Sequence, residues 1–175
     1  MHFAIRFIIL LSGAACLAAQ PIKGELIEGV ATVQDGDGLL LVDPSGKEVT
    51  IRLFGIDAPE SAQTCKRSDG SVYRCGRIAA AFLEQWVSGY PVSCRVEDRD
   101  HHKRRVSTCS IAGMDIGEQI VGQGYARAYT KYSRRYEAIE EAAKRDARGF
   151  WGGSWDAPWN YRRKVRKQRP DNGRG

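Results

Sequence analysis

Three groups of polar and charged residues interrupt an otherwise apolar sequence. The first is Asp35-Gly36-Asp37-Gly38, a turn sequence with two carboxylates at alternate positions. The second is Arg52 followed by Asp57 and Glu60, at the end of an apolar segment. The third runs from Asp98 to Arg105 and contains the basic residues Arg99, Lys103, Arg104 and Arg105.

Carboxylates gathered in this way are typical ligands of a hard divalent cation. Two or three carboxylates, a backbone carbonyl and water describe a calcium or magnesium site, and no set of cysteines and histidines in the sequence competes for a softer metal. Attack on a phosphodiester also needs a base that activates water, and cations that stabilise charge on the phosphoryl oxygens. Glu60 and two of the arginines could supply both.

Each group taken alone has a simpler interpretation. Asp-Gly-Asp is usually a tight turn, Pro-Glu after a strand is commonly a loop, and a basic run is usually a solvated hairpin tip. Adjacent histidines on a turn point apart, so we expect His101 and His102 to be solvated rather than to bind zinc. The order and spacing of the three groups together favour a catalytic site over these simpler interpretations.

Short strands must position these groups. Residues 26–53 are strand-like, and Asp43-Pro44-Ser45-Gly46 predicts a type I turn that closes a hairpin. Alternation along the returning strand directs Arg52 away from the apolar face. Residues 92–96 and 106–111 predict a second hairpin with the charged run at its tip.

Three helices are expected around the strands. Apolar offsets of three and four predict a helix over residues 79–87, which Gly89 ends. Asp115 and Glu118 have the spacing of a capping pair, and a third helix is expected over residues 134–148. This order suits an α+β fold, a small β-barrel with helices packed on it.

The three groups, in this order, resemble the thermonuclease, or staphylococcal nuclease-like, family. The matching segments are Val33-Gln34-Asp35-Gly36-Asp37, Ile51-Arg52-Leu53-Phe54-Gly55-Ile56-Asp57-Ala58-Pro59-Glu60, Asp100 to Arg104, and Gly149-Phe150-Trp151. The resemblance implies an OB-fold, a five-stranded barrel with about three packed helices. It also implies a calcium-dependent phosphodiesterase that cuts DNA and RNA with little sequence specificity and leaves 3′ phosphates.

The resemblance implies roles for individual residues. Asp37, Asp57 and the backbone carbonyl of Ala58 would bind Ca²⁺. Asp35 would lie next to these ligands without binding the metal itself. Three residues would be catalytic: Glu60 would position or deprotonate the attacking water, while Arg52 and Arg104 would hold the phosphate.

The sequence departs from the family pattern at two turns. Gly38 stands where threonine is usual, which removes a hydroxyl beside Asp37. Asp-x-Tyr-Gly-Arg reads Asp100-His101-His102-Lys103-Arg104, so Lys103 takes the place of a turn glycine and would adopt a positive φ only at some cost. We choose Arg104 rather than Arg105, because Val106 keeps the expected spacing after it.

Candidate substrate-binding residues surround these groups. Aromatic side chains bind single strands by stacking with little sequence preference, which makes Tyr129 and Tyr132 candidates; Tyr125 could stack in the same way or belong to the core. Lys103 is a further candidate for a phosphate contact.

Residues 1–19 have the pattern of a secretory signal peptide: Arg6, an apolar run and then small residues. The uncharged stretch of 13 residues from Phe7 to Ala19 is shorter than the roughly 20 needed to cross a bilayer. We therefore expect a secreted or periplasmic protein without stable membrane insertion. Lipid attachment at Cys16 is the alternative.

Removal of this segment leaves four cysteines, which in an exported chain suggests two disulfide bonds. Three pairings are formally possible. Local geometry favours Cys65 with Cys75, closing a polar loop, and Cys94 with Cys109, joining two strands. A zinc site would require paired C-x-x-C spacings, and none is present.

The net charge of +6 on the 175 residues is unevenly distributed. Residues 161–175 carry +6, and residues 20–160 carry −1. We predict one nuclease-like domain over residues 20–154 and a basic, flexible C-terminal tail over residues 155–175 that adds salt-sensitive attraction to polyanions.

Two functions remain. The first is a monomeric nuclease acting on DNA and RNA, preferably single-stranded. The alternative is a non-catalytic OB-fold module that binds nucleic acid or a protein. The clustered carboxylates favour catalysis, because a pure binder gains nothing from like charges beside a phosphate.

Overall fold

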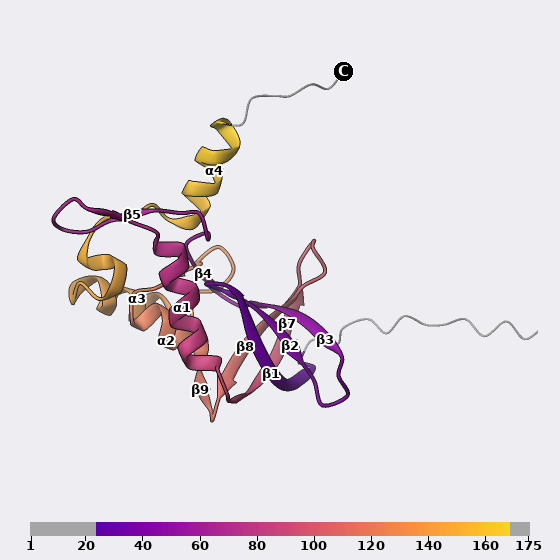
Figure 1. Cartoon of the computed structure of the whole chain (residues 1–175). Coiled ribbons are helices and arrows are strands. Elements are labelled where there is room, and N and C mark those ends of the chain that lie inside the picture. Colours follow the sequence, from indigo (N-terminus) through magenta and orange to yellow (C-terminus); the bar gives the residue numbers. More distant parts are fainter. Residues whose placement is uncertain (1–23, 169–175) are drawn as a thin grey trace, which may run out of the picture.

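Five strands close into a barrel at the centre of the molecule (Figure 1). The computed structural model describes residues 24–168, so the predicted signal segment and Cys16 lie outside the described residues. The barrel strands are β1 (Leu26–Asp35), β2 (Gly38–Val42), β3 (Glu48–Leu53), β7 (Pro91–Arg99) and β8 (Arg105–Ile111). Their pairings are antiparallel except for the parallel pair of β3 and β8, which closes the barrel. The predicted five-stranded barrel is confirmed.

Alternation along the strands decides which side chains enter the barrel. Apolar side chains of alternate positions fill it, among them Leu39, Leu41, Ile51, Leu53, Val92 and Val96. The predicted turn between β2 and β3 is present: the Asp43 carbonyl accepts from the Gly46 N–H at 2.9 Å, and the Asp43 carboxylate accepts from Ser45 and Lys47. Arg52 leaves β3 on the face opposite Ile51 and Leu53, as predicted.

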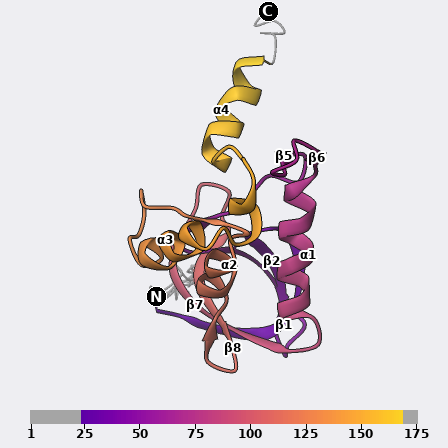
Figure 2. The ribbon, with the colours of Figure 1, turned by 90° about the vertical axis from the view of Figure 1, so that its left-hand side faces the viewer.

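The three predicted helices are present. They are α1 (Cys75–Val87), α2 (Ile116–Gly122) and α3 (Glu137–Arg145). Helix α1 runs beside the barrel (Figure 2). Its face with Ala79, Leu83 and Val87 is buried. Asp115 caps α2 by accepting from the Glu118 N–H at 3.1 Å. Helix α3 is shorter than predicted, since residues 134–136 precede it and Asp146 ends it.

Short elements complete the fold. They are β4 (Ile56–Asp57), β5 (Cys65–Lys66), β6 (Val72–Tyr73), β9 (Met114–Asp115), β10 (Arg127–Ala128) and the 3₁₀ helix η1 (Gly149–Gly152). Both favoured disulfides are present, Cys65–Cys75 and Cys94–Cys109. The second joins residues that are directly opposite each other on β7 and β8. The pairing predicted from the sequence is confirmed.

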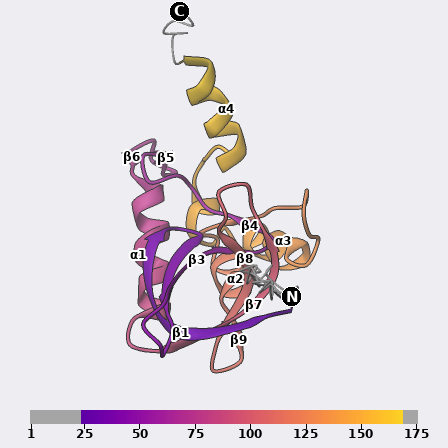
Figure 3. The same cartoon turned by 90° about the vertical axis from the view of Figure 1, so that its right-hand side faces the viewer.

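A fourth helix corrects the prediction of a flexible tail. Residues Pro158–Gln168 form α4, which extends away from the barrel in Figures 1 and 3. The prediction relied on the absence of an apolar face, but arginine, lysine and glutamine are good helix formers, and proline is favoured at the first helical position. Of the residues described, none belongs to a helix long and apolar enough to cross a membrane.

Candidate functional site

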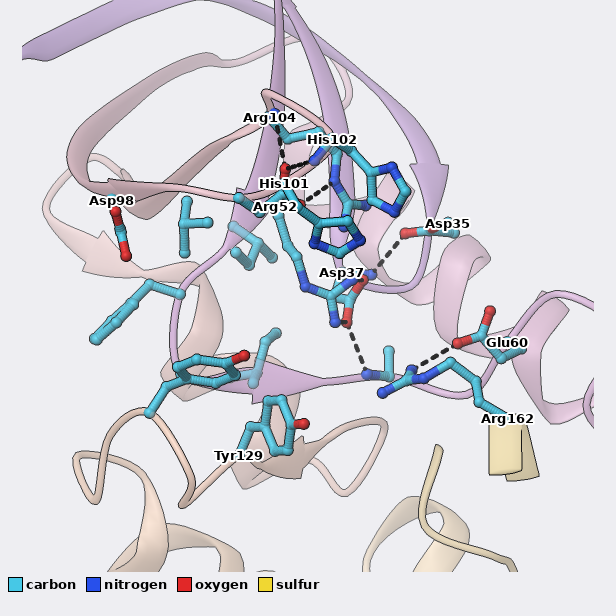
Figure 4. Close-up of a pocket in the computed structure, with 18 of the residues that line it drawn as sticks. Asp35, Asp37, Arg52, Glu60, Asp98, His101, His102, Arg104, Tyr129 and Arg162 are labelled. Atoms are coloured by element: carbon cyan, nitrogen blue, oxygen red, sulfur yellow. Dashed lines mark hydrogen bonds and ion pairs between the residues drawn. The ribbon is translucent and has the colours of Figure 1, made fainter. Parts of the chain in front are cut away.

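The three polar groups of the sequence meet at one cavity of about 690 Å³ (Figure 4). The turn after β1, the loop after β3, the tip of the β7–β8 hairpin and α4 all contribute to its lining. The predicted site residues that line it are Asp35, Asp37, Arg52, Ala58, Glu60, Arg104, Tyr129 and Tyr132. Asp57 is fully buried behind them.

Asp37 and Asp57 converge on the guanidinium of Arg52. Arg52 Nη2 lies 3.0 Å from Asp37 Oδ2 and 2.9 Å from Asp57 Oδ1, and its Nη1 donates to Asp37 Oδ1 at 3.2 Å. Because both carboxylates contact the same nitrogen, their oxygens are close enough to share one cation. The turn between β1 and β2, strand β3 and the two-residue strand β4 thus bring Asp37, Arg52 and Asp57 to the same point.

Burial changes the acidity of these groups. It raises the pKa of Asp37 to about 7, and Arg52 offsets only part of this rise, to which Asp35 and Asp57 add. Burial alone would lower the pKa of Arg52, but Asp37 and Asp57 outweigh it and raise that pKa. A cation bound beside Asp37 would relieve its repulsion by Asp35 and Asp57 and favour its ionised form.

The turn after β1 fixes Asp37 through Asp35. Asp35 Oδ1 accepts from the Asp37 N–H at 3.2 Å. A β-carbon on Gly38 would lie 2.7 Å from the same Asp35 oxygen, so a larger residue at position 38 would push Asp35 aside. Gly38 therefore lacks the hydroxyl of the usual threonine, but it allows the Asp35 carboxylate to pack directly on it.

The acid pair and the chain after it fit a calcium ion. Ala58 N–H donates to Asp37 Oδ2 at 3.1 Å, which brings the backbone at Ala58 beside the carboxylate. Hard oxygen ligands from Asp37, Asp57 and the Ala58 carbonyl match the preference of calcium. Within residues 24–168 no three His, Cys, Asp or Glu side chains gather as a metal site.

Hydrogen bonds to Gln63 fix the backbone of Glu60. Its N–H donates to Gln63 Oε1 at 3.3 Å, and its carbonyl accepts from the Gln63 N–H at 2.7 Å. Gln63 is itself fully buried and donates to the Asp156 carbonyl at 2.8 Å. At the start of α1, Gly76 packs so closely that a β-carbon there would lie 1.8 Å from the Glu60 carbonyl oxygen.

Arg104 reaches the cavity from the hairpin tip. Asp100 Oδ2 accepts from Arg104 Nε at 2.8 Å, and Asp100 Oδ1 accepts from the Arg104 N–H at 2.9 Å. Burial opposes ionisation of Asp100, but the hydrogen bonds from Arg104 outweigh it and lower the pKa of Asp100. Arg105 instead lies 4.0 Å from Glu25 Oε2 and does not line the cavity.

Lys103 has the backbone conformation that its position predicts, with φ of 65°. Its side chain does not line the main cavity but a smaller neighbouring one, beside Lys47 and Glu48. His101 and His102 are exposed, as expected, but their rings do not point apart: the ring centroids are 3.8 Å from each other. Both histidines line the main cavity.

Two of the three tyrosines considered face the cavity. Tyr129 and Tyr132 line it, with ring centroids 5.0 Å apart. Tyr125 instead packs against Phe82, with ring centroids 4.2 Å apart, beside the core. Trp159 of α4 stacks on Tyr129 at 5.3 Å with an angle of 14° between the rings.

Arg162, which no motif in the sequence singles out, contacts both Asp57 and Glu60. Figure 4 shows its contact with Glu60. No local signal identifies it, because 105 residues separate it from Asp57 and it belongs to a run of similar basic residues. Gln63 was missed for the related reason that its partners are backbone groups rather than a motif.

A closed five-stranded barrel of this order, with short strands and helices outside, defines an OB-fold protein. A family model described as staphylococcal nuclease homologue matches residues 50–153, more than half of the chain. The protein belongs to this family. The match begins within β3 and ends before α4, so Asp35, Asp37 and Arg162 lie outside it.

Several curated proteins are similar to the chain. The chain is 36% identical over 111 residues to the succinoglycan biosynthesis protein ExoI of Rhizobium meliloti, covering 62% of the chain and 53% of that protein. It is 28% identical over 104 residues to an uncharacterized endonuclease of Haemophilus influenzae, covering 59% and 53%. It is 34% identical over 88 residues to the probable staphylococcal-like nuclease CAN1 of Oryza sativa subsp. japonica, covering 50% and 24%. The chain spans about half the length of the first two and less of the third.

Proposed function

We propose that the protein is an exported, calcium-dependent nuclease that hydrolyses phosphodiester bonds of DNA and RNA and leaves 3′ phosphates. One observation carries the proposal: buried Asp37 and Asp57, the base candidate Glu60, and the arginines Arg52 and Arg104 all meet at one cavity. Membership of the nuclease-like family supports nucleic acid as the substrate. The two disulfides are typical of an oxidising compartment and support export.

Asp37, Asp57 and the Ala58 carbonyl would hold the calcium ion, with Asp35 supporting Asp37. When bound, calcium would bind a phosphate oxygen and neutralise its charge. These residues lie on the β1–β2 turn of the barrel, on β4 and directly after it, and β4 is paired with β10, so they are held in place before the substrate arrives.

In the proposed reaction, a water molecule attacks the phosphorus while Glu60 accepts one of its protons. Arg52 and Arg104 donate hydrogen bonds to the phosphoryl oxygens as negative charge grows on them. The bond from phosphorus to the 5′ oxygen breaks, and that oxygen takes a proton from solvent. Tyr129 and Tyr132 offer ring faces to a base of a single-stranded substrate.

The proposal is tested with a labelled single-stranded DNA in excess calcium and in excess chelator. Cleavage in calcium alone, with products that carry a 3′ phosphate, is the expected result. No calcium-dependent cleavage at any neutral or alkaline pH would reject the nuclease.

The Glu60→Gln variant separates catalysis from binding. We expect it to lower turnover by about 100-fold or more, the usual contribution of a general base, and to keep the affinity for DNA. Glu28→Gln is the matched control, because Glu28 is exposed on β1 and makes no side-chain contact with the cavity. Unchanged turnover in Glu60→Gln would refute the assigned role.

A second candidate function is a module that binds nucleic acid or protein without cutting it. The contact of Arg162 with Glu60 favours it, because a paired Glu60 is not free to accept a proton. DNA binding without any cleavage, in calcium and in magnesium, would support this second function.

A further inference from the structure

Helix α4 contacts the barrel through residues of its first two turns, and Arg166 beyond them lines the cavity. Pro158 is buried and the Trp159 ring lies on Tyr129, whereas Arg163 and the residues Lys164, Arg166 and Lys167 are exposed. Figures 1 to 3 show the remaining turns extending past the barrel. A short, strongly basic helix without an apolar face gains little from its own propensity, so its position depends on these few contacts.

The strongest of these contacts is made by Arg162. Its Nη2 donates to Asp57 Oδ2 at 2.7 Å and its Nη1 donates to Asp57 Oδ1 at 3.0 Å, a bidentate pair with a fully buried carboxylate. The same Nη1 lies 2.7 Å from Glu60 Oε1. Charge-assisted, bidentate pairs of this kind are among the strongest polar contacts in proteins.

These contacts use the groups that the reaction needs. Asp57 Oδ1 already accepts from Arg52, so with Arg162 in place both oxygens of Asp57 have cationic partners. A calcium ion on Asp57 would stand beside the Arg162 guanidinium, and two cations at contact distance repel strongly in a buried site. Arg162 and calcium therefore compete for one carboxylate.

The same helix also covers the aromatic end of the cavity. Trp159 lies on one face of Tyr129 in a nearly parallel stack. A base that stacks on this face of Tyr129 would have to replace Trp159. One helix thus holds an arginine at the acidic end and a ring at the aromatic end.

We propose that α4 is an internal inhibitor: Arg162 holds the site closed without metal, and calcium and Arg162 bind Asp57 and Glu60 in a mutually exclusive way. The proposal rests on the proposed calcium-dependent function and describes its regulation. When calcium binds, Arg162 leaves Asp57, Glu60 becomes free to accept a proton, and α4 loses its strongest contact with the barrel. The segment that carries this device lies outside the family match, which ends at residue 153.

Calcium titration of the purified full-length protein by calorimetry tests the competition. We expect Arg162→Ala to bind calcium about tenfold more tightly than the wild type or better, because binding no longer breaks a charge-assisted pair. Arg163→Ala is the matched control: it removes the same charge from the same helix, but the partner of Arg163 among residues 24–168 is Asn160. Its calcium affinity should stay within about twofold of the wild type, as expected for an exposed charge.

Hydrogen exchange gives a readout that does not depend on affinity. In the wild type, saturating calcium should increase backbone amide exchange over residues 158–168. In Arg162→Ala, exchange of this segment should be fast with or without calcium. Two results would overturn the proposal that α4 is an inhibitor. One is unchanged exchange in the wild type with calcium bound, and the other is equal calcium affinity of Arg162→Ala and wild type.

Failure of this proposal is distinguishable from failure of the proposed function. Calcium-dependent DNA cleavage with the same calcium midpoint in wild type and Arg162→Ala would keep the nuclease and reject the inhibitor. Tighter calcium binding by Arg162→Ala without any DNA cleavage would keep the competition and reject the nuclease. If neither protein binds calcium, both proposals are rejected.

Discussion

Arg104 depends on Asp100 for its direction into the cavity. The Asp100 carboxylate accepts from the side chain and the backbone of Arg104 and from the His102 N–H, which closes the hairpin tip. Asp100 does not contact the acidic pair among the described residues, so we assign it a positioning role. Its substitution should act through Arg104.

A double-mutant cycle tests this role. Asp100→Ala should lower kcat by about tenfold, the order of effect expected when a group that stabilises transition-state charge is misplaced. If Asp100 acts only through Arg104, adding Asp100→Ala to Arg104→Ala should change kcat no further. Steady-state kinetics of the four proteins give the coupling, and additive losses would contradict the role.

Lys103 occupies a position where its side chain costs stability. Its φ of 65° lies in the left-handed region, which costs a residue with a β-carbon about 1 to 2 kcal/mol. Lys103→Gly should therefore raise the free energy of unfolding by up to about 1 kcal/mol, since the flexibility of glycine in the unfolded chain offsets part of the gain. Urea denaturation measures the change.

Lys103→Ala is the control for this prediction, because it removes the charge and the long side chain but keeps the β-carbon. It should give no such gain. Equal stabilisation by alanine and glycine would show that the lysine charge, rather than the backbone, sets the cost.

At the scale of elements, the start of α1 determines where Glu60 lies. Gly76 allows the helix to pack directly on the Glu60 carbonyl, and the disulfide of Cys75 with Cys65 fixes the same end of the helix. The chain from Glu60 to Cys65 is thereby held against the start of α1. Activity should be sensitive to this packing even though Gly76 does not line the cavity.

Gly76→Ala is the corresponding substitution. Its β-carbon would lie 1.8 Å from the Glu60 carbonyl oxygen and 2.9 Å from the Ser61 Cα, so the loop backbone must shift. We expect kcat to fall by about 10- to 100-fold, because displacements near 1 Å can have effects of this size. Gln85→Ala on the exposed side of α1 is the control, and wild-type kcat in Gly76→Ala would contradict the prediction.

At the scale of the whole molecule, charge is separated between the barrel and the C-terminal segment. Residues 20–160 carry −1 and residues 161–175 carry +6. The charge that suggests a polyanionic partner thus lies mostly outside the barrel, while α4 brings one of its arginines into the acidic site. The segment therefore acts on the proposed nuclease in two opposite ways. Its positive charge attracts nucleic acid, whereas Arg162 occupies Asp57, which the reaction needs.

Removal of residues 161–175 should separate these effects. Binding of single-stranded DNA should weaken at low salt and show a smaller salt dependence, because fewer phosphates are neutralised. Calcium affinity should rise as in Arg162→Ala, and turnover at saturating calcium and DNA should be unchanged. Fluorescence anisotropy over a salt series and steady-state kinetics measure these quantities, and a large fall in saturated turnover would contradict the prediction.

Local patterns in the sequence were sufficient for much of this protein. Alternation in β3 predicted the direction of Arg52, the Asp43–Gly46 turn predicted a hairpin, and the spacing of Asp115 and Glu118 predicted a helix start. The disulfide pairing followed as well, because each pair lies close in the chain, with separations of 10 and 15 residues. Such features depend on neighbours in sequence, and the sequence displays them directly.

Tertiary structure alone decided the position of α4 and the partner of Arg162. The charged face of a helix carries no information about which distant carboxylate it will meet, and Arg162 differs from Arg163 only by its direction on the helix. That direction depends on the packing of Pro158 and Trp159 against the folded barrel. The sequence by itself therefore determined which groups could act on a phosphodiester, and the fold determined that Arg162 contacts two of them.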